Sequence, residues 1–192
     1  MSMSSQDRRK DDRTWLYVAV AFAAFWGIYL LFFNPKGPSG APMLDGSGLL
    51  IPADYGWKAT DLNGKAVDFA TFQGKPVFLN IWATWCPPCR AEMPSIAKLA
   101  ADPRIKGKVE IVCVATDDDL ETVRKFVAEK AWPMTLLHTR RIPDVFQTQG
   151  IPATFLIDRS GKIVAHEVGS AAWDSPEVVD FLVKMANEPQ KR

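Results

Sequence analysis

Hydrophobic positions along this chain form one long uninterrupted run and then several short runs separated by polar residues. The long run extends from Trp15 to Phe33 without a charged residue and has aromatic residues near both ends. This pattern is typical of a helix that crosses a membrane, and the basic residues before it predict a cytoplasmic N-terminus. We therefore expect a cytoplasmic segment over residues 1–14 and a single-pass anchor over residues 15–33 in a bacterial inner membrane. The rest of the chain is then periplasmic or extracytoplasmic.

A cleavable signal peptide is the alternative interpretation of the same apolar run. The small residues Ser39, Gly40 and Ala41 resemble a cleavage site for such a peptide. However, the apolar part of a signal peptide is usually only about 7 to 15 residues long, and this run is longer. The pattern therefore favours an anchor that stays attached to the protein.

Residues 34–51 are rich in proline, glycine and serine, a composition that favours a flexible linker over a packed element. Residues 52–187 combine short apolar runs with amphipathic stretches, which is typical of one globular domain. A polar C-terminal tail follows over residues 188–192.

Within the domain, the pattern predicts strands that alternate with helices, then a hairpin and a closing helix. Asn63 and Gly64 favour a tight turn between the first two strands, and Val77 to Trp82 is typical of a strand buried on both faces. The other predicted elements are a helix after Cys89, a strand at 109–115, a helix opened by a capping box at 118–121, a strand at 134–137, a helix at 143–149 ended by Gly150, paired strands at 153–158 and 162–168, and a helix starting at 174–176. This order predicts a three-layer α/β fold with a central mixed sheet and an N-terminal β-hairpin extension.

Composition narrows the possible functions. The chain has 192 residues, of which 47% are hydrophobic and 23% charged, as is typical of a globular protein. Its formal net charge of +1 provides no basic surface for nucleic acid, so we do not expect nucleic-acid binding. The 3 cysteines are too few for a disulfide-stapled scaffold.

Cys86 and Cys89 are separated by two residues, a spacing typical of redox-active cysteine pairs. They follow the strand at 77–82 closely, so the first cysteine is expected at an exposed helix start, where free N–H groups and the helix dipole stabilise a thiolate. We therefore assign Cys86 as the nucleophile and Cys89, one helical turn further, as the resolving thiol. A zinc half-site and an inert structural disulfide are the alternatives.

Three segments resemble the membrane-anchored, thioredoxin-like oxidoreductases of the TlpA/ResA/DsbE type. They are the run NIWATWCPPC from Asn80 to Cys89, the tripeptide Glu92-Met93-Pro94, and the run GIPATF from Gly150 to Phe155. The similarity covers about residues 55 to 186. It implies a thioredoxin fold and a protein-disulfide reductase whose redox group is its own cysteine pair, with no other cofactor. It further implies a membrane thiol transporter as electron donor and, in many relatives, apocytochrome c as substrate.

Further site residues follow from their positions relative to the cysteines. Glu92 lies three residues after Cys89 on the same helical face, where its carboxylate could exchange a proton with the sulfur; a solvated glutamate in the first turn is the alternative. Asn80 stands where thioredoxins proper carry a buried aspartate that handles the proton of the resolving thiol. The resemblance also implies a cis peptide between Ile151 and Pro152 that lies against the cysteine pair and presents backbone to substrate.

The residues between the cysteines bear on the direction of the reaction. Pro87 and Pro88 have no backbone N–H, which leaves mainly the N–H of Cys89 and the helix dipole to stabilise the Cys86 thiolate. No histidine lies between the cysteines to add positive charge. We therefore predict a reductant. Trp85 is expected to line a peptide-binding surface together with the two prolines.

The remaining candidates are expected to be structural. Cys113 lies in an apolar strand and is predicted to be buried away from the site, Trp82 is expected in the core, and His138 and His166 have no partner at metal-ligand spacing. A copper-binding assembly factor on the same fold is one alternative function, but such relatives carry three residues between the cysteines. A thiol peroxidase is another, but we do not find the threonine pattern of those enzymes. No metal is expected.

Overall fold

The computed structural model describes residues 14–26, 42, 50–117 and 119–188. Residues 14–26 form a helix that corresponds to the first part of the predicted membrane span, and residues 27–33 of that span lie outside the described residues. Among the described residues, no helix combines the length and the apolar character that crossing a membrane requires. Most of the predicted linker over residues 34–51 also lies outside the described residues.

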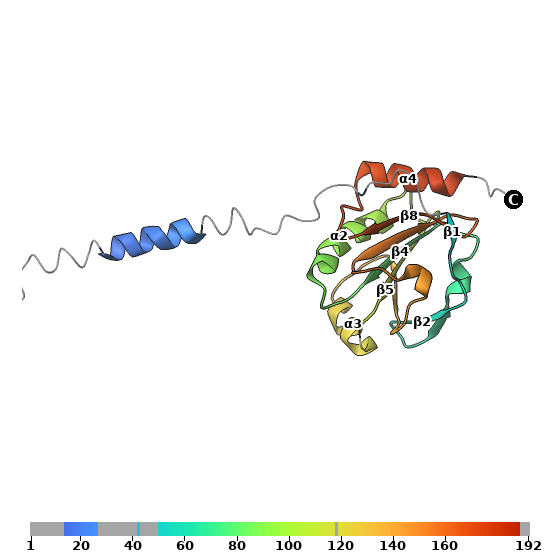
Figure 1. The fold of residues 1–192 in the computed structure, drawn as a ribbon, viewed down its shortest axis with the longest axis horizontal. Coiled ribbons are helices and arrows are strands. Elements are labelled where there is room, and N and C mark those ends of the chain that lie inside the picture. Colours follow the sequence, from blue (N-terminus) through green and yellow to red (C-terminus); the bar gives the residue numbers. More distant parts are fainter. Residues whose placement is uncertain (1–13, 27–41, 43–49, 118, 189–192) are drawn as a thin grey trace, which may run out of the picture. The chain divides into compact units, whose positions relative to one another are not determined.

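A mixed sheet of eight strands forms the centre of the domain (Figure 1). Its order is β1-β8-β7-β4-β5-β6-β2-β3. The β4–β5 and β5–β6 pairs are parallel, and the other pairs are antiparallel. The strands are β1 (Ile51–Pro52), β2 (Lys58–Asp61), β3 (Ala66–Asp68), β4 (Val77–Trp82), β5 (Glu110–Ala115), β6 (Thr135–His138), β7 (Ala153–Ile157) and β8 (Lys162–Val168). The predicted central mixed sheet is therefore confirmed.

Strand β4 lies in the middle of the sheet because almost all of its residues are apolar. All six are buried, and the strand pairs with β5 on one side and β7 on the other. Such a continuous apolar sequence is stable only where both faces of the sheet are covered. Its one polar residue, Asn80, is also buried and belongs to the site described below.

The hairpin predicted around Asn63 and Gly64 forms one edge of the sheet. Strands β2 and β3 are antiparallel, and Gly64 has a φ of 88°, a left-handed conformation that glycine adopts at low cost. Strand β2 also pairs with β6. The hairpin therefore extends the sheet.

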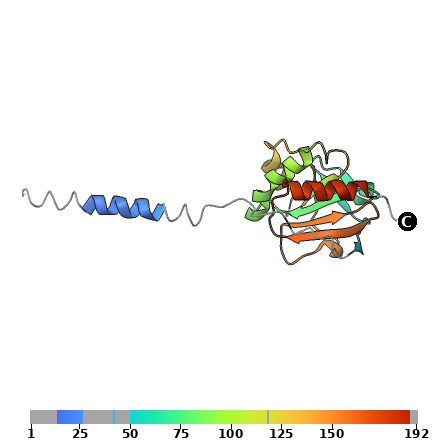
Figure 2. The same cartoon turned by 90° about the horizontal axis from the view of Figure 1, so that it is seen from above.

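Three α-helices lie on one face of the sheet (Figure 2). They are α2 (Pro87–Ala101), α3 (Leu120–Val127) and α4 (Pro176–Asn187). The opposite face is covered by the 3-10 helices η1 (Phe69–Phe72) and η2 (Asp144–Phe146) and by aromatic side chains, among them Trp57 stacked on Phe69. The sheet thus has a covering layer on each side, but in the described part of the chain one of these layers consists of short 3-10 helices and aromatic rings in place of an α-helix.

Two helix boundaries differ from the prediction. Helix α3 has Asp119 as its N-cap, one residue later than the predicted capping box, because its carboxylate accepts the N–H of Thr122 at 2.8 Å. Helix η2 ends at Phe146 and does not reach Gly150. Phe146 is its only buried residue, so this stretch has no apolar face that would stabilise a longer helix.

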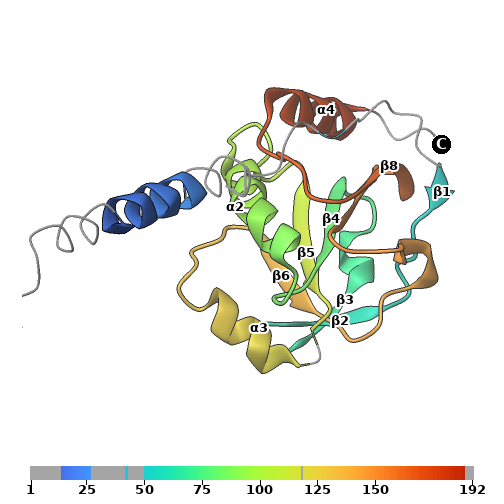
Figure 3. The same ribbon diagram turned by 60° about the vertical axis from the view of Figure 1, so that its left-hand side comes forward.

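Helix α2 positions the cysteines. It begins shortly after β4 ends and lies across the strands β4 and β5 (Figure 3). The buried side chains of α2 include Cys89, Glu92, Met93 and Ile96. The same face of the helix therefore contributes both to the core and to the candidate site.

Candidate active site

The two cysteines form a disulfide at the start of α2. The Cα atoms of Cys86 and Cys89 lie 5.3 Å apart. Cys86 is the N-cap of the helix, and its Sγ accepts the backbone N–H of Cys89 at 3.2 Å. Pro87 and Pro88 occupy the first helical positions and have no N–H to donate. The N–H of Cys89 is therefore the donor that the sequence predicted.

Cys86 is less exposed than the sequence suggested. Only 3% of its surface is accessible, and Cys89 is fully buried. The reason is that Cys86 Sγ turns inward and lies 3.7 Å from the carbonyl oxygen of Ile151. Trp85, which is 68% exposed, and the two prolines form the outer surface instead. The prediction of an exposed cysteine is wrong for the disulfide form, although Cys86 remains the outer of the two.

Ile151 and Pro152 precede β7 and bring backbone to the disulfide. Their peptide bond is cis, as the resemblance implied. Pro152 is buried, and its carbonyl oxygen accepts the N–H of Gly169 at 2.9 Å. The residues predicted to present backbone to a substrate therefore lie beside the cysteine pair.

Glu92 lies inside the domain, on the face of α2 that packs against the sheet. It is fully buried, and its carboxylate accepts three N–H groups. Oε1 accepts from Asn80 Nδ2 at 2.8 Å, while Oε2 accepts from Trp173 Nε1 at 2.9 Å and from the N–H of Ala171 at 3.3 Å. The alternative of a solvated glutamate in the first turn is therefore excluded.

Burial raises the pKa of Glu92 from its ordinary value of 4.5 to about 7. The hydrogen bonds from Trp173, Asn80 and Ala171 lower the pKa because they stabilise the carboxylate, but the loss of hydration is the larger effect. A carboxyl group that titrates near neutrality is suited to both accepting and donating a proton. The physical requirement for the predicted role of Glu92 is thus present.

Asn80 connects Glu92 to strand β7. Its Nδ2 also donates to Thr154 Oγ1 at 2.9 Å, and the two residues are directly opposite each other in the β4–β7 pair. Both side chains are buried. The sequence singled out Asn80 by its distance from Cys86. It assigned no role to Thr154, which belongs to the GIPATF run, and it did not single out Trp173; both reach the site through the fold.

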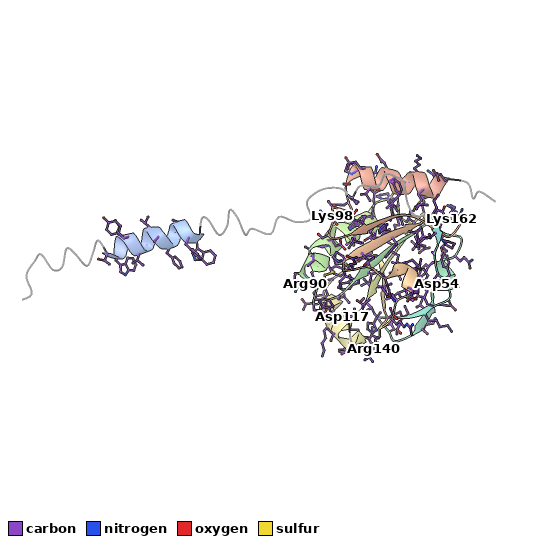
Figure 4. All side chains as sticks on the ribbon, in the orientation of Figure 1. Asp54, Arg90, Lys98, Asp117, Arg140 and Lys162 are labelled. Carbon is purple, nitrogen blue, oxygen red and sulfur yellow. A yellow bond between two sulfur atoms is a disulfide. The ribbon has the colours of Figure 1, made fainter. Side chains whose placement is uncertain are left out.

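A second buried polar contact holds the loop that carries the cysteines. Asp117, which follows β5 and is labelled in Figure 4, accepts the N–H of Thr84 at 3.0 Å and also its hydroxyl group. Nε2 of His138 lies 2.8 Å from the carbonyl oxygen of Asp117, so His138 is a buried structural residue with a hydrogen-bond partner. Because the hydroxyl of Thr84 is directed at Asp117, it does not serve Cys86 as a peroxidatic threonine would. Asp117 was not among the predicted site residues, although an aspartate shortly after a buried strand is a sequence signal for a residue near a site.

Cys113 is buried in β5, as predicted, but it lies beside the site and not away from it. It is opposite Asn80 in the β4–β5 pair. Burial and, to a smaller extent, the charge of Glu92 raise the pKa of its thiol well above the ordinary value. Such a thiol is unreactive.

Metal-ligating side chains do not gather in the described part of the chain, where no three of them lie close enough together to hold an ion. The ring of His166 stacks on Phe155, with centroids 6.1 Å apart. The copper-binding alternative requires a histidine next to the two sulfurs. His166 stacks on Phe155 and His138 contacts Asp117, so neither histidine takes this role.

Aromatic and basic side chains join α3 to the helix that carries the cysteines. The ring of Phe126 lies 5.7 Å from that of the buried Trp82, measured between centroids. Arg90, labelled in Figure 4, follows Cys89 on α2 and places its guanidinium carbon 5.3 Å from the Phe126 centroid. Nζ of Lys130 lies 4.4 Å from the same centroid. The Arg90 contact stabilises the packing of α3 against the start of α2, whereas the Lys130 contact is local to the end of α3.

Comparison with known proteins agrees with this geometry. Residues 38–182, which include the disulfide, Glu92 and the Ile151-Pro152 peptide, match the profile of the Redoxin family. The chain belongs to the Redoxin family. Its resemblance to the TlpA/ResA/DsbE type is borne out by individual members.

Among the relatives of this Redoxin-family chain is the thiol-disulfide oxidoreductase ResA of Bacillus thuringiensis (strain Al Hakam). The two are 37% identical over 112 residues, which is 57% of this chain and 64% of the relative. The chain therefore spans less than two thirds of that relative's length.

Solved structures show the same domain. The thioredoxin domain of a thiol-disulfide oxidoreductase from Bacteroides vulgatus superimposes with a TM-score of 0.55 and 29% identity, covering 72% of this chain and 99% of that structure. A secreted Mycobacterium tuberculosis disulfide oxidoreductase homologous to E. coli DsbE gives a TM-score of 0.51 and 28% identity, with 68% and 96% coverage. The thioredoxin-like fold is thus shown.

Proposed function

We propose that this Redoxin-family protein is a thiol–disulfide oxidoreductase that reduces disulfides in other proteins. The observation that carries the proposal is the Cys86–Cys89 disulfide at the start of α2, with the N–H of Cys89 directed at the Cys86 sulfur. This N–H and the helix dipole favour a thiolate on Cys86. The name that the similar proteins share supports the same activity.

In this proposal the reaction starts from the dithiol and moves two electrons to the substrate. The Cys86 thiolate attacks one sulfur of the substrate disulfide and bonds to it, and the other substrate sulfur leaves as a thiolate. Cys89 then gives up its proton to the Glu92 carboxylate, attacks Cys86 Sγ and breaks the mixed disulfide. The second substrate thiolate leaves, and the enzyme ends with the Cys86–Cys89 disulfide.

Reduction is the favoured direction because the Cys86 thiolate receives limited stabilisation. The two prolines after it offer no N–H. Glu92, when ionised, adds a negative charge on the same helix one turn beyond Cys89. A dithiol whose thiolate is weakly stabilised is oxidised more readily, which makes it the better electron donor.

Trapping of the mixed disulfide tests the assignment of the two cysteines. With Cys89→Ala, no internal thiol completes the exchange, so covalent complexes with substrate proteins should accumulate after an acid quench and disappear from reducing gels. With Cys86→Ala, no complex is expected. Cys113→Ala in each background is the control. Equal trapping by both single variants, or trapping in Cys86→Ala that needs Cys113, would contradict the assignment.

We further propose that residues 15–33 anchor the protein in a bacterial inner membrane, with the Redoxin domain on the periplasmic or extracytoplasmic side. The apolar run and the basic residues that precede it support this topology. The resemblance to ResA and DsbE supports a membrane thiol-transferring electron donor and, as substrate, apocytochrome c. These partners match the chemistry, because a reductant needs a source of two electrons and a protein disulfide to receive them.

Protease protection tests this topology. Protease added to intact spheroplasts is expected to remove the domain over residues 52–187 and to spare a cytoplasmic marker. Release of the domain from membranes by carbonate without protease would contradict anchoring. Full protection until lysis would reverse the orientation.

A further inference from the structure

The side-chain amide of Asn80 is bonded at one end only. Nδ2 donates to Glu92 Oε1 at 2.8 Å and to Thr154 Oγ1 at 2.9 Å. Oδ1 is buried, and none of the residues that the structure describes donates a hydrogen bond to it. A buried amide oxygen without a partner is unfavourable and rare. The amide can therefore turn without breaking a hydrogen bond at its oxygen.

The present orientation suits an ionised Glu92. A carboxylate accepts hydrogen bonds and donates none, and the groups that face it from Asn80, Trp173 and Ala171 are all N–H donors. A protonated Glu92 has an O–H that needs an acceptor. The indole of Trp173 and the N–H of Ala171 have no acceptor atom to offer. The amide oxygen of Asn80 is the acceptor that becomes available if the amide rotates.

A half-turn of the amide exchanges its oxygen and nitrogen without changing its shape. Oδ1 then occupies the present position of Nδ2, where it faces Glu92 Oε1 and Thr154 Oγ1. Thr154 fits both orientations, because a hydroxyl accepts from Nδ2 in one and donates to Oδ1 in the other. Asn80 and Glu92 are 0% exposed and Thr154 is 1% exposed, so water does not compete at their surface.

We propose that Asn80 is a positioning residue whose amide rotates when Glu92 gains or loses a proton, with Thr154 as its bonding partner in both orientations. The O–H bond of Glu92 is the only covalent bond that forms or breaks. The rotation keeps Glu92 hydrogen-bonded in both protonation states. Its use in turnover rests on the proposed function, in which Glu92 takes the proton of Cys89. The rotation itself requires no substrate.

Among the titratable groups around Glu92, the Glu92 carboxyl is the one whose protonation can turn the Asn80 amide. From β5, Cys113 faces the site with a thiol whose pKa is raised well above its ordinary value. From α2, Cys89 is held in the disulfide and does not titrate. In the segment before α4, Asp174 follows Trp173 and pairs with Lys98 at 3.2 Å. Glu92 is the one of these groups that is bonded to the amide.

NMR of the oxidised full chain in detergent micelles tests the rotation directly. The Glu92 carboxyl carbon gives its titration midpoint, and the nuclear Overhauser effect between the Asn80 NH2 protons and the Thr154 side chain reports the amide orientation. We expect this effect to be strong above the Glu92 midpoint and weak below it. In Glu92→Gln, it is expected to stay the same across the range, because the glutamine NH2 mimics the protonated state. An effect of constant strength while Glu92 titrates in the wild type would overturn the proposal.

A matched pair of variants separates a rotating amide from a fixed donor. Trp173→Phe removes an N–H that can only donate and therefore bonds the ionised form of Glu92 more strongly than the protonated form. This variant is expected to raise the pKa of Glu92 by about 1 to 2 pH units. Asn80→Leu removes an amide that can donate to the ionised form of Glu92 and accept from the protonated form. Its loss is therefore expected to raise the pKa of Glu92 by less than half as much as Trp173→Phe does. An equal rise in the two variants identifies Asn80 as a fixed donor and overturns the proposal. If Asn80→Leu does not fold, the wild-type measurement decides alone.

A disulfide-reduction assay run on the same samples separates this inference from the proposed function. Absence of reductase activity, with a normal orientation change at Asn80, would bear on the function alone. Normal reductase activity with an amide that never rotates would reject the inference alone.

Discussion

Replacement of Glu92 by glutamine is expected to make the stability of the protein less dependent on pH. Glu92 is fully buried on α2, and its pKa is raised from 4.5 to about 7 because burial removes its hydration. Glutamine has nearly the same shape and does not titrate. Its amide oxygen retains the hydrogen bonds from Trp173 and Ala171, so the fold is preserved.

The magnitude follows from the difference between the folded and unfolded pKa values. Between pH 4.5 and about 7, the unfolded chain has released the Glu92 proton and the folded protein still holds it. The free energy of unfolding therefore falls as the pH rises through this window. At about 1.4 kcal/mol per pH unit, the loss amounts to about 3 kcal/mol. This contribution is fully present below pH 4.5 and absent well above 7.

Urea unfolding of the oxidised full chain in a mild detergent measures the effect, because the disulfide prevents titration of Cys86 and Cys89. The free energy of unfolding of Glu92→Gln minus that of wild type is expected to rise by about 3 kcal/mol from pH 4.5 to about 8. Glu129→Gln, which changes an exposed glutamate, is the control and should follow the wild-type curve. A Glu92→Gln difference that stays constant within about 0.5 kcal/mol across the range would refute the reasoning.

Three further predictions concern the surroundings of the disulfide. Glu92→Gln should slow reduction of a protein disulfide about 100-fold and remove the pH dependence near neutrality, so unchanged turnover between about pH 5.5 and 8.5 would leave Glu92 a structural residue. Asp117→Ala should lower the free energy of unfolding by about 2 to 3 kcal/mol because it leaves the buried N–H and hydroxyl of Thr84 unpaired, whereas Thr84→Val should cost about 1; equal urea midpoints for wild type and Asp117→Ala would contradict this. Cys113 should resist iodoacetamide in the folded oxidised chain and react after unfolding, and labelling of the folded chain would show that its thiol is accessible.

Local sequence signals were sufficient to predict the centre of the fold. The nearly continuous apolar run of β4 indicated burial on both faces, and the two cysteines shortly after it marked the start of α2. Gly64 marked the turn of the N-terminal hairpin, and it has the positive φ that such a turn requires. These features depend on residues that are neighbours in the sequence, so they can be inferred without knowledge of the tertiary structure.

The hydrogen-bond network around Glu92 could not be predicted in the same way. Thr154 is 74 residues from Asn80, and Trp173 is 81 residues from Glu92. The antiparallel register of β4 and β7 brings the first pair together, while the segment between β8 and α4 delivers the second. Dependence on strand register also explains why Cys113 was predicted to lie away from the site. Its burial was evident from the apolar residues around it, but its position opposite Asn80 depends on the β4–β5 register.

The network also explains why an amide and not a carboxylate occupies position 80. Thioredoxins proper carry a buried aspartate at this point of the strand, whereas here the buried carboxyl comes from Glu92 on the helix. Two carboxylates in these positions would face each other across the 2.8 Å that now separates Asn80 Nδ2 from Glu92 Oε1. Like charges at that distance cannot both ionise, and one carboxyl would hold its proton far above neutrality. With Asn80 in the strand, the site keeps a single carboxyl that titrates near neutrality, and the amide remains able to bond it in both forms.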